Sequence, residues 1–314
     1  MTSQQEKQAP AAPVQTLTLP DGRTLSYATY GATSPSAPTV LYFHGFPASH
    51  AEAAPLHAAA LARGLRIVAP DRPGMGGSTF QRGRAIGDWP ADAAALADRV
   101  RAARFAVLGV SGGAPYALAC CRDGSTSERV VGAAVVAGLY PPQLGLAGML
   151  PGARALLWVA PWCTPLVRWA LDWGVGAAAR DGAEGALEGL VARGMAGRPG
   201  PDRRVWEDDE GGFRGALVAS IRGALRESAA GAAWEARLFG WGWGFGLEEV
   251  RVVGAGRVVM WHGALDVNSP VAMAEKAAAL MGAAAELRVE RDEAHASLTV
   301  HKVDEVLDTL KAFF

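Results

Sequence analysis

The chain has 314 residues, of which 50% are hydrophobic and 19% are charged, so it is long enough for one large α/β domain with an insertion or for two domains. Its formal net charge of −1 provides no basic surface for nucleic acid, and its three cysteines imply no disulfide framework. Neither a secretory signal nor an apolar run of bilayer length is visible, which predicts a cytoplasmic protein without a transmembrane segment.

Residues 1–14 are first polar and then rich in Ala and Pro, as in a flexible leader. Two strands are expected at 15–19 and 24–30, because the Asp21-Gly22 pair between them is a strong hairpin signal. Strands and helices then alternate. Further strands are expected at 39–43, 65–70, 105–108 and 130–136, with helices at 50–63, 88–103 and 114–121.

The alternation stops near residue 139. It resumes with a strand at 257–261, a helix at 271–281, a strand at 286–290 and a helix at 298–313. The interval is mostly helical in pattern and contains eight of the ten tryptophans. We therefore predict an α/β fold with a doubly wound, mostly parallel, eight-stranded sheet flanked by helices. The core would span 15–138 and 251–314, and a helical cap would be inserted at 139–250.

After the strand at 105–108, Gly109-Val110-Ser111-Gly112-Gly113 has the pattern G-x-S-x-G. A strand, a sharp turn and a helix are the context of a nucleophile elbow, in which a serine hydroxyl stands clear of the sheet. Glycines are expected beside the serine because a side chain there would clash with the neighbouring strand or helix. The chain has 39 glycines, so this pattern alone does not distinguish a catalytic serine from a helix-capping serine.

The rest of the chain supplies the partners that a serine nucleophile needs. In doubly wound hydrolases an orienting Asp or Glu and then a His follow the serine. Asp266 follows the strand at 257–261, and His295 follows the last strand. Both lie at the carboxyl ends of parallel strands, where open α/β sheets build their sites. We predict Ser111, Asp266 and His295 as catalytic residues, with His50, His57 and His301 at the surface and His262 in a structural position.

The oxyanion of an acyl-transfer reaction needs N–H donors. The N–H of Gly112, directly after the nucleophile, is the first expected donor. The second is the N–H of Phe46 in His44-Gly45-Phe46-Pro47, a loop that follows the strand at 39–43. This loop precedes the elbow by one strand-helix-strand-helix interval, which makes an ordinary turn a poor explanation.

These elements, in this order, resemble the α/β-hydrolase fold superfamily in its serine-nucleophile branch with a helical cap. The resemblance extends from about residue 15 to the C-terminus. It rests on residues 44–47, 71–78, 109–113 and 263–266 and on His295. The segment 71–78, Asp-Arg-Pro-Gly-Met-Gly-Gly-Ser, resembles a structural signature of the superfamily, and the resemblance implies that its glycines form tight turns beside the site.

Superfamily members that open epoxides or cleave carbon–halogen bonds carry an aspartate where this chain has Ser111. The resemblance therefore implies acyl chemistry, and we expect hydrolysis of an ester or lactone of a small, largely apolar substrate through an acyl-enzyme. Three alternatives stay open. They are cleavage of a carbon–carbon bond next to a ketone by the same triad, peptidase action on a small N-terminal residue, and a receptor-like, ligand-binding role with little turnover.

An apolar pocket above Ser111 is expected, with Phe46 and Tyr116 as walls from the core and Trp158 and Trp162 as walls from the cap. Packing of the cap against the core would account for most of the other tryptophans.

Neither metal-ligand spacing nor a G-x-G-x-x-G loop between a strand and a helix is present, so no metal and no cofactor are expected. The expected partner is a small-molecule substrate. Contact of the uncharged stretch between Arg154 and Arg168 with a lipid interface, and a homodimer, are left open.

Overall fold

The structure, a computed structural model, describes residues 12–181, 185–252 and 257–314, so most of the predicted leader lies outside the described residues. The strands of the described part form one sheet in the order β1-β2-β4-β3-β5-β6-β7-β8. They are β1 (Gln15–Thr18), β2 (Thr24–Gly31), β3 (Thr39–Phe43), β4 (Arg66–Pro70), β5 (Phe105–Val110), β6 (Val130–Val136), β7 (Val258–Gly263) and β8 (Ala285–Glu290). β2 runs antiparallel to β1 and β4, and the other neighbours are parallel. The predicted mostly parallel, eight-stranded sheet is confirmed.

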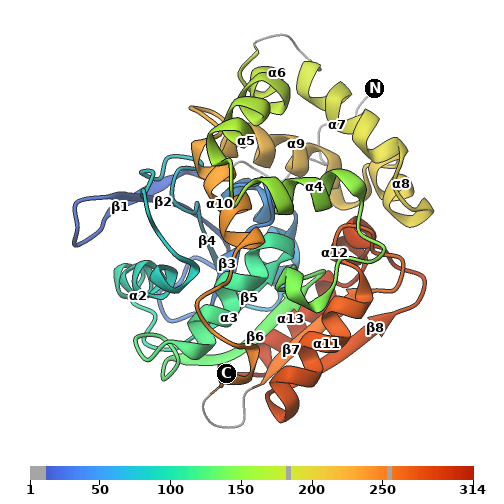
Figure 1. The fold of residues 1–314 in the computed structure, drawn as a ribbon. Coiled ribbons are helices and arrows are strands. Elements are labelled where there is room, and N and C mark those ends of the chain that lie inside the picture. Colours follow the sequence, from blue (N-terminus) through green and yellow to red (C-terminus); the bar gives the residue numbers. More distant parts are fainter. Residues whose placement is uncertain (1–11, 182–184, 253–256) are drawn as a thin grey trace, which may run out of the picture.

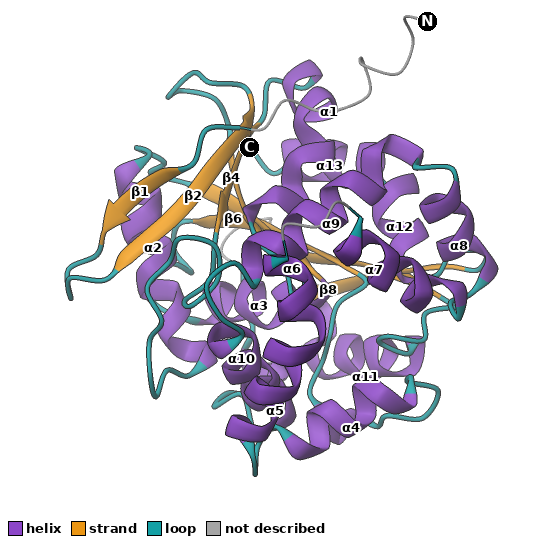
Figure 2. Cartoon of the chain, turned by 90° about the horizontal axis from the view of Figure 1, so that it is seen from above, coloured by secondary structure: helices purple, strands orange, loops and turns teal. Residues whose placement is uncertain are grey.

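Helices cover both faces of this sheet, as predicted (Figures 1 and 2). On one face lie α2 (Trp89–Arg99), α3 (Ala114–Arg122) and α11 (Val271–Met281), and on the other lie α1 (His57–Ala62), α12 (His295–His301) and α13 (Val303–Lys311). Successive residues of β5 join opposite cores: Phe105 and Val107 pack in the first, and Ala106 and Leu108 in the second. A continuous apolar strand is the pattern of a sheet that is buried on both faces.

Between β6 and β7 the chain forms a group of helices that lies above the sheet in Figure 1. They are α4 (Pro151–Val159), α5 (Thr164–Leu171), α6 (Ala177–Arg180), α7 (Ala186–Ala196), α8 (Gly200–Glu207), α9 (Phe213–Ala224) and α10 (Ala230–Gly240). We call these the cap helices. The fold class with inserted helices is confirmed, whereas the boundaries at 139 and 250 stay a prediction. None of the helices in the described part combines the length and the apolar character that crossing a membrane requires.

Two predicted helices are divided in the structure. The stretch expected as a helix at 50–63 begins as the 3-10 helix η1 (His50–Leu56), which contains Pro55, and becomes α-helical only from His57. Proline lacks the N–H that an α-helical hydrogen bond needs. The last helix, expected at 298–313, begins earlier, at His295, and is interrupted after His301, so that it forms α12 and α13.

Candidate active site

Ser111 lies at a strained turn between β5 and α3. Its φ is +51°, in the left-handed region that non-glycine residues rarely adopt. The flanking glycines are needed for close approach: a Cβ on Gly113 would collide with the carbonyl oxygen of Phe43, and a Cβ on Gly109 would lie 2.8 Å from the carbonyl oxygen of Gly113. The turn therefore has the backbone geometry expected of a nucleophile elbow.

The side chains of Ser111, His295 and Asp266 form a continuous hydrogen-bonded line. His295 Nε2 is 3.0 Å from Ser111 Oγ, and His295 Nδ1 is 2.7 Å from Asp266 Oδ2. The other oxygen of Asp266 accepts the backbone N–H groups of Asn268 and Ser269 at 2.7 and 2.9 Å. The structure thus brings together the three residues that the sequence nominated, from loops after three different strands.

Burial and charge act in opposite directions on this line. Burial alone would raise the pKa of Asp266, but the neighbouring His295 holds it below its usual value. For His295, burial alone would lower the pKa, but Asp266 raises it above its usual value. The pair therefore favours an ionised carboxylate that orients the imidazole and stabilises its protonated form.

His262, assigned by the sequence to a structural position, lies behind the carboxylate. Its Nε2 donates to the carbonyl oxygen of Ser269 at 2.6 Å and is 3.6 Å from Asp266 Oδ2. Burial lowers its pKa, so the ring is neutral. It contacts the loop that holds Asp266, and Asp266 and His295 lie between it and Ser111.

The two expected oxyanion donors lie next to each other. A Cβ on Gly112 would be 2.9 Å from Phe46 Cβ, and a Cβ on Gly45 would be 3.5 Å from Ser111 Cβ. In the described part of the chain, the Phe46 N–H has no hydrogen-bond acceptor. An amide without an acceptor beside a serine hydroxyl suits an oxyanion-binding group.

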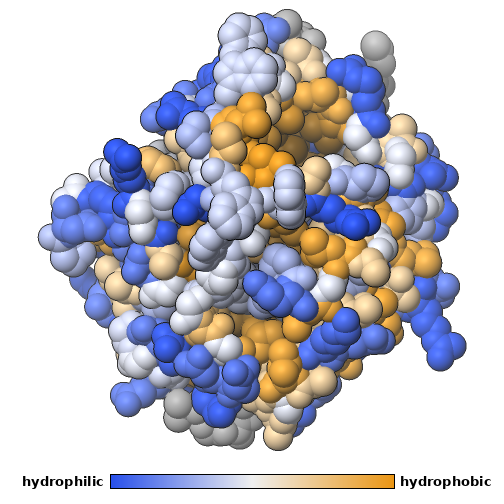
Figure 3. Space-filling model, viewed as in Figure 1, coloured by the Kyte–Doolittle hydropathy of each residue, from blue (hydrophilic) through white to orange (hydrophobic). Residues whose placement is uncertain are grey.

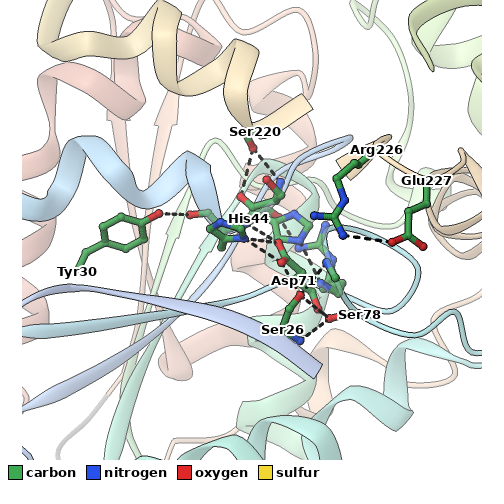
Figure 4. A network of polar contacts seen from close by, with 12 residues as sticks. Ser26, Tyr30, His44, Asp71, Ser78, Ser220, Arg226 and Glu227 are labelled. Atoms are coloured by element: carbon green, nitrogen blue, oxygen red, sulfur yellow. Dashed lines mark hydrogen bonds and ion pairs between the residues drawn. The ribbon is translucent and has the colours of Figure 1, made fainter. Parts of the chain in front are cut away.

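Asp71, in the segment with the structural signature, is the centre of a buried polar network beside this loop (Figure 4). Its carboxylate accepts the Ser26 hydroxyl at 2.6 Å and the backbone N–H of His50 at 2.7 Å, and the ring Nδ1 of His50 lies 2.9 Å away. The side chain of His50 is only 16% exposed. The surface position predicted for His50 is therefore wrong, because Asp71 draws the ring inward.

Asp202, a residue that the sequence did not nominate, contacts the first turn of α12. Its buried Oδ1 accepts the backbone N–H groups of Ala296 and Ser297 at 2.8 and 3.0 Å. These are the donors that an N-cap side chain normally satisfies, and the N-cap residue itself is Ala294, which cannot do so. A carboxylate on cap helix α8 thereby caps the helix whose first residue is His295.

The expected pocket walls lie in different surroundings. Phe46 is partly buried, and its ring packs edge-on against Phe239 at 5.6 Å. Tyr116 is fully buried, and its hydroxyl accepts Arg84 Nη1 at 3.0 Å. Trp158 and Trp162 are 73% and 75% exposed, on the outside of the cap. Tyr116 and these two tryptophans therefore do not form an enclosed pocket above Ser111, since one lies inside the core and two face solvent.

Among the described residues, no group of three or more His, Cys, Asp or Glu side chains is arranged to hold a metal ion.

The chain is similar to known proteins over most of its length. The family model described as "Alpha/beta hydrolase family" matches residues 40–309. An enol-lactonase from Burkholderia xenovorans is 18% identical, with a TM-score of 0.64 over 95% of this chain and 99% of that chain. An esterase from Exiguobacterium antarcticum is 17% identical, with a TM-score of 0.63 over 95% and 98%. A bromoperoxidase from Bacillus anthracis is 14% identical, with a TM-score of 0.64 over 96% and 99%. At these identities the likeness is one of fold. No curated protein matches the sequence significantly.

Proposed function

The chain belongs to the alpha/beta hydrolase family and is a hydrolase of that fold, and we propose that it cleaves an ester or lactone of a small, largely apolar substrate with Ser111 as nucleophile. The observation that carries the proposal is the line from Asp266 through His295 to Ser111, with distances of 2.7 and 3.0 Å. A base and an orienting carboxylate within hydrogen-bond reach are what a serine hydroxyl needs to attack an acyl carbon.

In the proposed reaction, His295 Nε2 takes the Ser111 proton as Oγ attacks the acyl carbon. The N–H groups of Gly112 and Phe46 bind the oxyanion of the tetrahedral intermediate. His295 then gives its proton to the oxygen of the leaving group. Departure of this group produces an ester between the acyl group and Ser111. Water attacks this ester while His295 accepts one of its protons. The proton returns to Ser111 as the acid departs, and Asp266 stays ionised throughout.

The preference for an ester or lactone has two supports. Both an esterase and an enol-lactonase are among the solved structures with this fold. Phe46 is partly buried, packs on the buried Phe239 and places an apolar side chain beside Gly112, where an acyl chain would lie. We therefore propose Phe46 as a substrate contact. The cytoplasmic location expected from the sequence stays a prediction.

A substrate panel tests the reaction. It contains short and long p-nitrophenyl esters, lactones, vinylogous diketones and aminoacyl amides, and is run on the wild type, on Ser111→Ala and on Ser36→Ala, in which an exposed serine is removed. We expect turnover of short esters or lactones, a loss of about 10⁴-fold or more in Ser111→Ala, and no change in Ser36→Ala.

A fluorophosphonate probe separates catalysis from ligand binding. It should label the wild type and Ser36→Ala but not Ser111→Ala. Equal labelling of all three proteins would contradict the proposed nucleophile. Turnover of diketones alone would assign the alternative carbon–carbon chemistry, turnover of aminoacyl amides alone a peptidase, and labelling without turnover of any substrate a receptor-like role.

A further inference from the structure

The peptide group between Gly45 and Phe46 is held from one side. A trans peptide is planar, so its C=O and N–H point in opposite directions and cannot turn independently. The Gly45 carbonyl oxygen accepts Arg72 Nη2 at 2.9 Å and His44 Nδ1 at 2.9 Å. Whatever holds this carbonyl therefore also sets the direction of the Phe46 N–H, the proposed oxyanion donor.

His44 has one protonation state that fits these contacts. Burial, together with the charge of Arg72, lowers the pKa of His44 to about 3, so the ring is neutral. Its Nε2 accepts the backbone N–H of Arg72 at 3.2 Å, which leaves the proton on Nδ1, facing the Gly45 carbonyl. The N–H of Gly45 donates to Glu52 Oε2 at 2.6 Å. Both polar groups of Gly45 are thus fixed, whereas the Phe46 N–H donates to no acceptor among the residues that the structure describes.

Arg72 makes more contacts with this loop than His44 does. Its Nη1 donates to the carbonyl oxygen of His44, so the guanidinium holds two successive carbonyl groups of the loop. The guanidinium also lies 4.7 Å from the centre of the Tyr116 ring. Only arginine has the planar, forked set of donors for these contacts, and a lysine ammonium at the same place could not reproduce them.

The counterion of Arg72 comes from the cap. Glu235 on α10 accepts Arg72 Nε and Nη2 at 2.5 and 2.9 Å, and both side chains are fully buried. Burial alone would raise the pKa of Glu235, but Arg72 and Arg84 hold it at about 2. A buried ion pair is often no more stabilising than apolar side chains of the same volume, so stability alone gives weak grounds for this arrangement.

We propose that Arg72 and Glu235 are positioning residues for oxyanion binding: the carboxylate on cap helix α10 orients the guanidinium, and the guanidinium fixes the Gly45–Phe46 peptide. Docking of α10 on the core and completion of the oxyanion site are then one event. The inference rests on the proposed function, because it gives the Phe46 N–H a role only if an oxyanion forms at Ser111.

Arg84 provides a matched control, because it contacts the same carboxylate but not the loop. Its Nη2 is 3.1 Å from Glu235 Oε1 and its Nη1 is 3.0 Å from the Tyr116 hydroxyl. We compare Arg72→Lys, Glu235→Gln and Arg84→Lys with the wild type at a temperature at which near-UV circular dichroism shows each to be folded. The measurements are kcat and KM for p-nitrophenyl acetate and Ki for a boronic acid, whose Ser111 adduct carries an anionic oxygen in the oxyanion site.

Loss of one oxyanion donor lowers kcat by about 10²- to 10³-fold in other enzymes, so we expect Arg72→Lys to lower kcat by about 30-fold or more. KM should stay within about threefold, and Ki of the boronic acid should rise in parallel with the loss in kcat. Glu235→Gln should show the same signature at smaller amplitude. Arg84→Lys should lower the melting temperature while kcat and Ki stay within about threefold of the wild type.

Equal losses of kcat in Arg72→Lys and Arg84→Lys, or an unchanged Ki in Arg72→Lys, would overturn the positioning role. Failure of both Arg72→Lys and Glu235→Gln to fold would assign the ion pair to stability and overturn it as well. These results are separate from a failure of the proposed function, in which Ser111→Ala would keep the turnover of the wild type.

Discussion

His295 is the residue at which the electrostatics of the site converge. It contacts Asp266 directly, and both Asp266 and Asp202 raise its pKa, against burial and the charge of Arg198. A general base must be unprotonated to act, and this histidine retains its proton to a higher pH than an isolated one. The pH dependence of activity therefore reports on its neighbours.

We predict that the acidic limb of the kcat/KM profile lies above pH 6.5, the ordinary pKa of histidine, and that Asp266→Asn moves it to lower pH. The shift follows because the substitution removes the charge that raises the pKa while the burial that lowers it remains. The activity of Asp266→Asn at its optimum should fall by about 10⁴-fold. Stopped-flow assays of an activated ester from pH 4 to 9 measure both effects, and an acidic limb that does not move would contradict this account.

The contribution of His295 to stability has the opposite dependence on pH from its activity as a base. Because the pKa of His295 is higher in the folded chain than in the unfolded chain, protonated His295 adds to the free energy of unfolding below about pH 6.5. This contribution is lost as the pH rises through the pKa that His295 has in the folded chain. Folding lowers the pKa of Asp266, so this residue stabilises the fold when the pH is above the pKa that it has in the unfolded chain. The stabilisation is lost as the pH falls through the pKa that Asp266 has in the folded chain. The form with protonated His295 and ionised Asp266 is stabilised but inactive as a base.

At the scale of secondary-structure elements, α8 and α12 belong to different parts of the fold but lie side by side (Figure 2), and Asp202 on α8 caps α12. The carboxylate of Asp202 faces the N-terminus of α12, where a negative charge is favoured by the exposed N–H groups and the helix dipole. His295 is the first residue of that helix, so its backbone position depends on this contact.

We predict that Asp202→Ala lowers the free energy of unfolding by about 1–2 kcal/mol, because two N–H groups of the first turn lose their acceptor. It should also lower kcat, since His295 is then less firmly placed. Asp202→Asn keeps an acceptor oxygen but loses the charge. It should retain most of the stability and shift the acidic limb of the kcat/KM profile to lower pH.

Urea unfolding and pH profiles measure these effects. Asp208→Asn is the control, because it removes an exposed carboxylate one residue beyond the end of the same helix. A fall in stability as large in Asp208→Asn as in Asp202→Ala would rule out a specific cap.

The sequence predicted helices, strands and turns correctly where the pattern that indicates them lies within the element itself. The alternation of apolar strands and helices predicted the sheet, and the glycines around Ser111 predicted the turn. Order along the chain was enough to nominate Asp266 and His295, which the structure brings next to Ser111. The roles of Asp202 and Glu235 could not be predicted from the sequence, because these residues contact partners 94 and 163 residues away and no periodicity links such positions. The tryptophans of the cap were expected partly as pocket walls, and periodicity could not distinguish an inner face from an outer one.

At the scale of the whole molecule, exposed tryptophans gather on α4, on α5, in the loop between them and in the π-helix at Asp172–Gly176. Trp158, Trp162, Trp169 and Trp173 are 73%, 75%, 60% and 73% exposed. In Figure 3, where tryptophan is pale because its hydropathy is near the middle of the scale, apolar residues in orange lie in the helical upper part of the molecule and also below it, with hydrophilic side chains between and around them. Tryptophan is enriched where a protein meets the boundary between water and lipid, because its ring is apolar and its N–H is polar.

Between Leu150 and Trp173 the chain has two arginines and one acidic residue, Asp172, which pairs with Arg168. The net charge of this side of the cap is positive, which suits an anionic lipid surface better than a neutral one. We predict that the protein co-sediments with vesicles of phosphatidylcholine and phosphatidylglycerol, and less so with phosphatidylcholine alone. At about 1.5 kcal/mol for each large side chain buried in the interface, Trp169→Ser with Trp173→Ser should lower the partition coefficient about 100-fold. Leu61→Ser, which removes an exposed apolar side chain from α1, should leave it unchanged. The alternative is that a second copy of the chain covers this surface, and sedimentation velocity on the same proteins tests it. If the wild type is a dimer that the tryptophan substitutions dissociate, and if it does not bind vesicles, the surface is a dimer interface and the lipid contact is contradicted.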